Sequence, residues 1–189
     1  MTTPTTTTTV QDLTGDYTLD PAHTRIGFVA RHAMVTKVRG SFAEFEGTAH
    51  LDFQDPTKSS AKLTIQVPSI NTGNAQRDEH LRANDFFDAP TYPEITFAST
   101  AVEVKGEDEF RLIGDLTIKG VTKSVAIDFE QTGSAKDPFG NTRVGFDGKA
   151  VINRTDWGVN FNAALETGGV LVSEKITLEF DVSAIKNAA

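Results

Sequence analysis

Apolar and polar residues alternate along most of the chain, a pattern typical of β-strands that bury one face. Within 61–67, Ala, Leu, Ile and Val take the odd positions and Lys, Thr and Gln take the even ones. The same alternation recurs in segments 26–30, 49–53, 110–118, 121–130, 144–152 and 176–182. Lys119-Gly120 separates two of these segments and predicts a hairpin turn. Seven or eight one-sided strands therefore account for most of the sequence, and the chain is predicted to be all-β.

Two interruptions of the alternation predict β-bulges, which let a strand turn a corner in a strongly curved sheet. The large apolar residues Phe42 and Phe45 are three positions apart, and the parity of the segment 95–104 flips between Ser99 and Val102. Long, bulged, antiparallel strands with Gly-rich turns favour a barrel, with a β-sandwich as the alternative.

One segment, 74–84, departs from the β pattern and predicts a short α-helix. Asn74 is a suitable N-cap, and Asp78 lies early in the segment, where a negative charge favours a helix. Arg82 lies four positions later, so an ion pair between Asp78 and Arg82 is expected. The segment leads into Phe86 and Phe87, two adjacent rings that both reach one core only if the backbone between them is irregular.

Composition and charge narrow the classes of function. The absence of cysteine excludes disulfides and thiolate metal sites, and 18 basic against 26 acidic residues give a net charge of −8, which disfavours nucleic-acid binding. Residues 1–13 form a Thr-rich leader without the charge and apolar run of a secretory signal, so we expect a disordered leader at 1–13, one folded domain at 14–186 and a cytoplasmic protein. No segment approaches the roughly 18 apolar residues of a transmembrane helix, so no stable membrane insertion is expected.

Catalytic motifs are not found in the sequence. The four histidines, His23, His32, His50 and His80, show neither HxH nor HExxH spacing, and no nucleophile elbow, Walker loop or dinucleotide fingerprint occurs. We therefore expect no metal and no cofactor. An acid–base site inside a barrel, made by His32 or His80 with a carboxylate and acting on a small apolar substrate, stays open as the enzymatic alternative.

Nine sequence blocks resemble, in order and spacing, the YceI-like family of polyisoprenoid-binding proteins. The blocks are LDPAHT (19–24), RHAM (31–34), VRGSF (38–42), SINTG (69–73), RDEHL (77–81), DFFD (85–88), YPEITF (92–97), GDLTIKGVTK (114–123) and INRTDWG (152–158). The resemblance covers about 15–185. It implies an antiparallel eight-stranded lipocalin-like β-barrel with one short α-helix, and in many cases a homodimer. Many members carry a secretory signal, from which the Thr-rich leader differs.

The resemblance also implies the ligand. An apolar lumen would hold a long isoprenoid lipid, either a polyprenyl phosphate or pyrophosphate or an isoprenoid quinone, for binding, storage or transport without catalysis. The strand parities supply the candidate wall: Phe28, Leu63, Ile65, Phe97, Leu116, Ile127, Phe146, Ile152 and Phe180, with Phe86 and Phe87 beside the helix and Trp157 at one end. Ordinary core packing is the alternative for each of them. Gly114 and Gly148 share the apolar parity and leave volume that either neighbours or a ligand would fill.

A lipid with a polar head group also needs hydrogen-bond donors at the cavity mouth. Arg31, His32 and Arg39 belong to the only dense basic cluster of this acidic chain, and we predict that they receive the head group. Arg77 and His80 on the predicted helix form a second candidate rim. For the first cluster the alternative is a solvated hairpin paired with nearby acids. For the second rim it is a local role, in which Asp78 and nearby turns satisfy the side chains, and the segment 153–156 is interpreted mainly as a turn held by its own side chains.

The aromatic composition agrees with an apolar lumen. Thirteen Phe stand against two Tyr and one Trp. Phenylalanine gives a smooth wall without a donor or acceptor, whereas a carbohydrate-binding sandwich would need exposed Tyr and Trp with polar edges.

Overall fold

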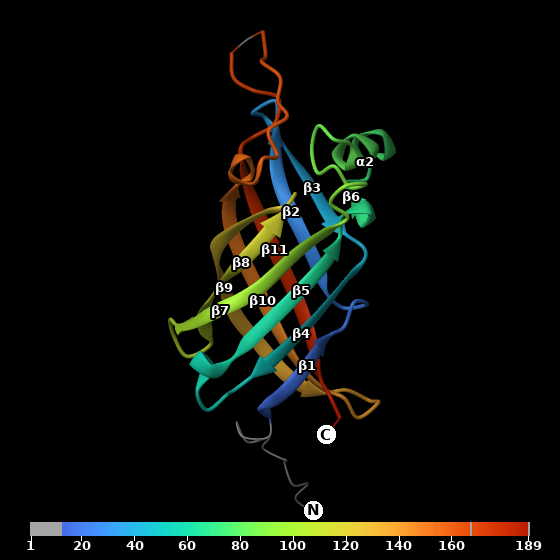
Figure 1. Ribbon diagram of the computed structural model, residues 1–189. Helices are drawn as coiled ribbons and strands as arrows, with labels where there is room; N and C mark the ends of the chain where they lie inside the picture. Colours follow the sequence, from blue (N-terminus) through green and yellow to red (C-terminus); the bar gives the residue numbers. More distant parts are fainter. Residues whose placement is uncertain (1–12, 167, 189) are drawn as a thin grey trace, which may run out of the picture.

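The computed structural model describes residues 13–166 and 168–188, and most of these lie in strands (Figure 1). The strands are β1 (Gly15–Leu19), β2 (Arg25–His32), β3 (Thr36–Phe42), β4 (Phe45–Leu51), β5 (Ser60–Gln66), β6 (Ile70–Asn71), β7 (Glu94–Val104), β8 (Glu109–Ile118), β9 (Val121–Lys136), β10 (Thr142–Asn153) and β11 (Lys175–Lys186), and the helix is α2 (Ala75–Arg82). The predicted leader lies outside the described residues except for Leu13, which is buried and accepts a hydrogen bond from the Tyr17 hydroxyl.

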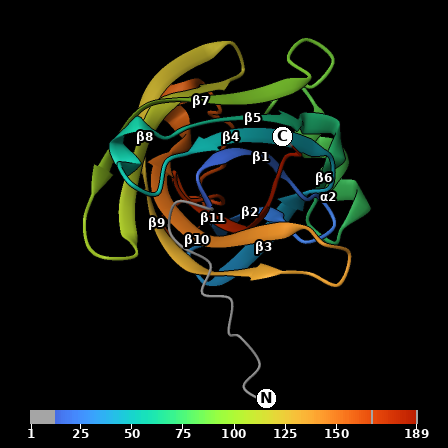
Figure 2. The same ribbon diagram turned by 90° about the horizontal axis from the view of Figure 1, so that it is seen from below.

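Eight strands close into an antiparallel barrel, which confirms the predicted fold class. The ring runs β1-β4-β5-β7-β8-β9-β10-β11 and is closed by the pairing of β11 with β1 (Figure 2). The edge of β11 that faces away from β10 pairs with two strands: residues 184–186 pair with β1, and residues 177–181 pair with β2. Beyond β2 the sheet continues through β3 and β6, which lie outside the closed ring.

The predicted hairpin turn and one of the two predicted β-bulges are confirmed, and the other bulge is not. Lys119 and Gly120 join β8 to β9 with φ values of 51° and 76°, the left-handed conformation that a two-residue hairpin turn requires. A register shift between Ser99 and Ala101 confirms the bulge in β7. The bulge predicted at 42–45 is wrong, because β3 ends at Phe42 and β4 begins at Phe45 with different neighbours.

The helix is confirmed, but its predicted ion pair is not. The Asn74 side chain caps α2 by accepting a hydrogen bond from the Arg77 amide. The Asp78 carboxylate is buried and accepts from the Thr72 amide at 2.9 Å and the Thr72 hydroxyl at 2.6 Å, so it fixes the loop before the helix instead of pairing with Arg82. No helix of the described part of the chain is long and apolar enough to cross a membrane.

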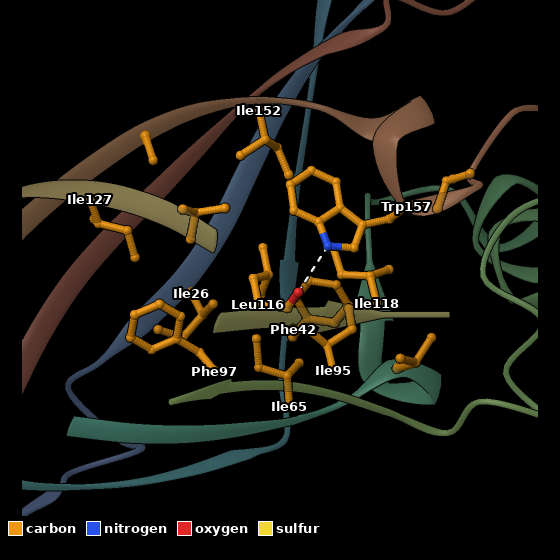
Figure 3. Close-up of a cluster of buried hydrophobic side chains, with 14 of the residues drawn as sticks. Ile26, Phe42, Ile65, Ile95, Phe97, Leu116, Ile118, Ile127, Ile152 and Trp157 are labelled. Carbon is orange, nitrogen blue, oxygen red and sulfur yellow. Dashed lines mark hydrogen bonds between the residues drawn. The ribbon is translucent and has the colours of Figure 1, made fainter. Parts of the chain in front are cut away.

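Inward-facing side chains form a main core along the barrel and a smaller cluster at the β1 end. The smaller cluster contains Leu13, Tyr17, Val144, Phe146 and Ala184. In the main core Trp157 is 3% exposed, and its indole N–H donates to the Leu116 carbonyl at 2.9 Å (Figure 3). The indole is thus closely packed and its N–H group has a hydrogen-bond acceptor. It forms a fixed aromatic group between β8 and the end of β10.

Candidate functional site

An apolar cavity of about 250 Å³ runs inside the barrel. A cavity that holds a single water needs only about 10–15 Å³ measured in this way, so this one is far larger than a packing defect. Its wall includes Leu19 of β1, Ala49 and Leu51 of β4, and Val159 and Val172 from the segment between β10 and β11. The barrel therefore encloses space along its length.

The structure brings eleven of the twelve predicted lumen residues to the wall of this cavity. They are Phe28, Leu63, Ile65, Phe86, Phe87, Phe97, Leu116, Ile127, Phe146, Ile152 and Phe180. Trp157 is the exception: it packs within the core close to the cavity wall without lining it. The wall comes from most strands of the barrel, from β2 and β3, and from the segment after α2.

Several inward-facing residues are only partly buried, although they lie on the apolar face of their strands. Phe28, Leu63 and Phe180 are packed against the main core and yet keep accessible surface, as do Ile176 and Leu178 on the same inward face of β11. Side chains in a closely packed core leave few voids larger than a water molecule. The inner wall of this barrel therefore presents apolar surface that its own side chains do not cover.

At two glycines on the inward face, a neighbouring aromatic ring occupies the space that a side chain would take, so these glycines do not widen the cavity. A Cβ at Gly114 would overlap the Phe97 ring, and a Cβ at Gly148 would overlap the Phe129 ring. The sequence left open whether neighbouring side chains or a ligand fill the volume beside these glycines, and in the structure neighbouring side chains fill it at both. Such ring-over-glycine contacts fix the position of aromatic side chains across a sheet.

Rings also form a connected cluster in one part of the wall. Phe129 stacks on Phe110 with centroids 5.6 Å apart, and it contacts Phe146 at 6.5 Å and Phe180 at 5.8 Å. All four rings line the cavity. Because these rings offer no donor or acceptor, this part of the wall can contact only apolar groups well.

Arg154 is the functional candidate that the sequence reasoning missed. It begins a short 3₁₀ helix after β10, is 6% exposed and lines the cavity. Its guanidinium donates to three backbone carbonyls: Nε to Ser173 at 2.9 Å, Nη1 to Val159 at 2.6 Å and Nη2 to Val172 at 3.2 Å. Burial lowers the pKa of this guanidinium, and the charge of Glu174 acts in the opposite direction.

No described acidic side chain forms an ion pair with Arg154, in contrast with Arg111 and Arg143, which pair with aspartates at 2.7–2.8 Å. A signal for Arg154 was present in the sequence. It continues the inward parity of Ala150 and Ile152, but the polar composition of 153–156 favoured the interpretation as a turn held by its own side chains.

The predicted head-group residues lie outside the cavity wall. Arg31 and His32 are exposed and lie at the Arg154 end, where the Arg31 backbone bonds to Ser173 and His32 bridges to Val172. Arg39 lies on the outer face of the barrel, 3.7 Å from Glu179, so the structure does not bring it to the mouth.

The residues of the second predicted rim serve local structure. Arg77 donates from Nε to the Thr72 hydroxyl at 2.7 Å and from Nη2 to the Thr72 carbonyl at 2.8 Å, which ties α2 to the preceding loop. The His80 ring contacts Phe86 and Phe161 with centroids 5.0 and 4.8 Å apart. His80 therefore joins α2 to Phe161, which lies in the segment after the short 3₁₀ helix.

The enzymatic alternative predicted a histidine–carboxylate pair inside the barrel, and the one such pair that His80 or His32 makes among the described residues lies outside the cavity. His80 Nε2 lies 3.1 Å from an Asp85 carboxylate oxygen, and both side chains are substantially exposed. None of the four histidines, all of them in the described part of the chain, lines the cavity. The described residues also contain no group of three or more His, Asp or Glu side chains that could hold a metal ion.

A charge network lies at the other end of the barrel. Arg143 on β10 contacts Asp20 and Asp137, each at 2.7 Å. Hydrogen bonds from Arg143 and His23 lower the pKa of Asp20 to about 2. Burial acts to raise the pKa of Asp137, but hydrogen bonds from Arg143 and Asn141 outweigh it and lower that pKa to about 2. This network joins the end of β9, the start of β10 and the segment after β1.

The fold and the cavity together define a small closed antiparallel barrel with an enclosed apolar site. A family model described as the YceI-like domain matches residues 17–184. The "UPF0312 protein SA2479" of Staphylococcus aureus is 41% identical over 165 residues, which cover 87% of this chain and 94% of that protein. The chain therefore belongs to the YceI-like family.

Solved structures show the same barrel. BcnA of Burkholderia cenocepacia is 26% identical, covers 87% of this chain and 98% of its own, and superposes with a TM-score of 0.78. A protein described as a polyisoprenoid binding domain from Saccharophagus degradans is 17% identical and covers 90% of this chain and 98% of its own, with a TM-score of 0.67. At that identity the second likeness shows the fold alone.

Proposed function

We propose that this protein binds a long isoprenoid lipid in the cavity of the barrel and stores or carries it without changing it chemically. The observation that carries this proposal is the apolar inner wall, on which aromatic and aliphatic side chains keep uncovered surface. Ligand sites are typically concave and mainly apolar, with few polar groups that set orientation. Here Arg154 is the charged side chain buried at the wall.

The energetics of such binding need no special chemistry. Each buried methylene contributes roughly 0.8 kcal/mol. About ten to fifteen well-buried methylene equivalents would offset the cost of association and leave micromolar or better affinity. A long isoprenoid chain exceeds that number, whereas a sugar would leave its hydroxyl groups without partners against the phenylalanine wall.

Membership of the YceI-like family supports an isoprenoid ligand, and the Saccharophagus degradans protein that shares the barrel fold is described as a polyisoprenoid binding domain. The non-enzymatic role is supported by the absence of histidine from the cavity wall. A barrel enzyme remains the second candidate, and the His80–Asp85 pair is the observation that favours it. Turnover of a prenyl substrate that is lost in His80→Gln and Asp85→Asn would establish the enzyme instead.

Lipid extraction tests the proposal directly. The protein is purified without detergent, extracted with organic solvent, and the extract is identified by mass spectrometry; apoprotein is then titrated with a fluorescent prenyl lipid. We expect a co-purifying isoprenoid and saturable uptake at one molecule per chain. A barrel that is repeatedly recovered without lipid and takes up none would overturn the proposal.

A matched pair of variants on β5 locates the binding. Leu63 lines the cavity, whereas Thr64, the next residue of the same strand, lies on the opposite face and does not line it. We expect Leu63→Trp to reduce uptake at least tenfold by filling the cavity, and Thr64→Trp to leave it unchanged. Equal uptake by both variants would contradict binding inside the barrel.

The homodimer implied by the family resemblance stays a prediction for this chain. Light scattering on the purified protein, with and without bound lipid, measures its oligomeric state.

A further inference from the structure

We propose that one end of the barrel docks on the surface of a lipid bilayer that carries anionic phosphate head groups. The docking tip consists of the apolar residues Met34, Val35 and Val170 with the flanking cations Arg31 and Lys37. The proposal rests on the proposed lipid-binding function and deepens it by naming the surface with which the protein exchanges its lipid. Contact of this kind is peripheral, because side chains reach the boundary between head groups and acyl chains without any segment crossing the bilayer.

Exposed apolar side chains gather at the docking tip. Six large apolar side chains are exposed in the described part of the chain, and three of them lie here: Met34 at 62%, Val35 at 75% and Val170 at 37%. The Ala33 amide donates to the Leu171 carbonyl at 2.7 Å, so the β2–β3 turn and the segment before β11 form one projection (Figure 1). Single exposed apolar side chains are ordinary on a protein surface, whereas a contiguous group of them indicates an interaction site.

The backbone of the turn holds Met34 in its exposed position. Ala33 and Met34 have φ values of 51° and 62°, a left-handed conformation that such residues adopt rarely. The Val35 amide closes the turn by donating to the His32 carbonyl at 3.0 Å. Asparagine and glycine would form a turn of this kind with less strain, so the chain keeps an apolar residue in solvent at a cost. Strain that surrounding hydrogen bonds maintain is typical of functional sites.

Two cations flank the apolar residues. Arg31 and Lys37 are direct partners across the β2–β3 hairpin, and both are exposed. Like charges in opposite positions destabilise a strand pair. No described acidic side chain forms an ion pair with either cation, including Glu166 and Glu174 in the segment before β11. Because the chain as a whole has a net charge of −8, an anionic bilayer would attract it only through a local cationic site such as this one.

The docking tip adjoins the wall of the cavity. Ala30, which precedes Arg31 on β2, lines the cavity, and so does Val172, two positions after Val170. A β-bridge between His32 and Val172 joins the two segments. A long isoprenoid exposes a large apolar area in water, so a bilayer is the phase that holds it. A docking surface beside the cavity wall would therefore bring the lipid-binding site to the source of the lipid.

Vesicle binding tests the proposal on the unmodified protein. The protein is sedimented with vesicles of phosphatidylcholine alone and with vesicles of phosphatidylcholine and phosphatidylglycerol, each in low and in high salt. A lysine or arginine near an anionic bilayer strengthens binding about fivefold, so two of them contribute about 25-fold. We expect at least tenfold tighter binding to the anionic vesicles and loss of this preference in high salt. Equal binding to both kinds of vesicle, or binding to neither, would overturn the proposal.

A double variant removes the apolar part of the docking tip. Met34→Asn suits the left-handed backbone of the turn and Val35→Thr keeps the β-branched shape, so we expect the fold to be retained. Vesicle binding should fall at least tenfold, because the apolar surface that enters the bilayer is lost.

Phe139→Ser is the matched control for the double variant. Phe139 is 89% exposed in the turn between β9 and β10, and Figure 1 shows this turn at the opposite end of the barrel. We expect this variant to bind vesicles as the unmodified protein does. Loss of binding in the control, or full binding by the double variant, would show that the contact does not lie at the docking tip.

A single dye locates the contact if the double variant does not fold. The chain has no cysteine, so Val35→Cys and Phe139→Cys each provide one site for an environment-sensitive fluorophore. Anionic vesicles should shift the emission of the dye to the blue in Val35→Cys and leave it unchanged in Phe139→Cys. The reverse result would place the contact at the wrong end of the barrel.

Uptake of a fluorescent prenyl lipid separates this proposal from the function on which it rests. The lipid is added either from ethanol, without vesicles, or in anionic donor vesicles. We expect the double variant to match the unmodified protein in uptake from ethanol, and to take up lipid from vesicles at least tenfold more slowly. Equal rates from vesicles would overturn the docking proposal and leave lipid binding standing. Vesicle binding by a protein that takes up no lipid from either source would overturn the lipid-binding function instead.

Discussion

The contact between Phe129 and Gly148 gives a prediction whose size follows from the geometry. Gly148 lies in the middle of β10 without the positive φ that would exclude a side chain, so the backbone itself accepts alanine. The added methyl group would overlap the Phe129 ring, which is held by stacking on Phe110 and by contacts with Phe146 and Phe180. Gly148→Ala must therefore displace a ring that three other rings hold in place.

The expected free-energy change combines two terms. Forcing an extra group into a packed site costs about 1–3 kcal/mol. Replacing glycine by alanine in a strand recovers about 0.5–1 kcal/mol through lower chain entropy in the unfolded state. We therefore expect Gly148→Ala to lower the free energy of unfolding by up to about 2.5 kcal/mol, with a central value of about 1 kcal/mol. Urea denaturation followed by circular dichroism measures this change, with an unchanged m-value as the sign of an unaltered transition.

Gly27 on β2 provides the matched control. It is also a strand glycine without positive φ, and a Cβ there would overlap only the flexible end of the Arg25 side chain. Moving that side chain affects its ion pair with Glu179 at 3.9 Å and a long hydrogen bond from Nη2 to the Gly40 carbonyl at 3.4 Å, both contacts of small value. We expect Gly27→Ala to be neutral or slightly stabilising. If Gly148→Ala proves as stable as Gly27→Ala, the ring does not occupy the glycine site as described.

Two further predictions concern the two ends of the barrel. Trp157→Phe removes the indole donor and leaves the buried Leu116 carbonyl without it, so we expect a loss of about 1–3 kcal/mol in urea denaturation, and a change below about 0.5 kcal/mol would contradict the role of this bond. Because the pKa values of Asp20 and Asp137 are about 2 in the folded state and lie below the ordinary 3.8, their stabilising contribution is complete above pH 4 and is lost as the pH falls from about 4 to 2. Arg143→Met should therefore lower the urea midpoint at pH 7 and reduce its further fall between pH 4 and pH 2; an unchanged pH profile would refute the network.

The wall of the cavity could be predicted because a strand repeats its side-chain direction every two residues. That rule alone places Leu63, Phe97 and Phe180 on one side of their strands, and the hairpin at Lys119-Gly120 follows from turn chemistry. The break between β3 and β4 could not be predicted, because Phe42 and Phe45 are apolar on both sides of it and only their pairing partners distinguish a bulge from a corner.

Arg154 shows why the candidate site was harder to predict than the fold. Local rules assign a charged residue after a strand to an exposed turn. Its burial depends on carbonyls of Val159, Val172 and Ser173, which the chain brings back over the end of the barrel. Conversely, Arg77 was a candidate for the second rim, with pairing to local groups as its alternative, and it is occupied by Thr72. Whether a cation is available depends on these partners, which residue spacing does not encode.

The closure of the ring by β1 and β11 has a consequence for how the chain acquires its structure during synthesis. The two strands that meet at this closure are the first and last of the barrel, and Thr18 donates a hydrogen bond to Asn187 across 169 residues. Domains fold as units while the ribosome delivers the chain from its N-terminus, so the barrel stays open until β11 emerges. Until then β1, β2 and β10 each lack a neighbour, and unpaired edges of this kind invite pairing with other chains. The last strand to be made is thus the one that protects all three edges from aggregation.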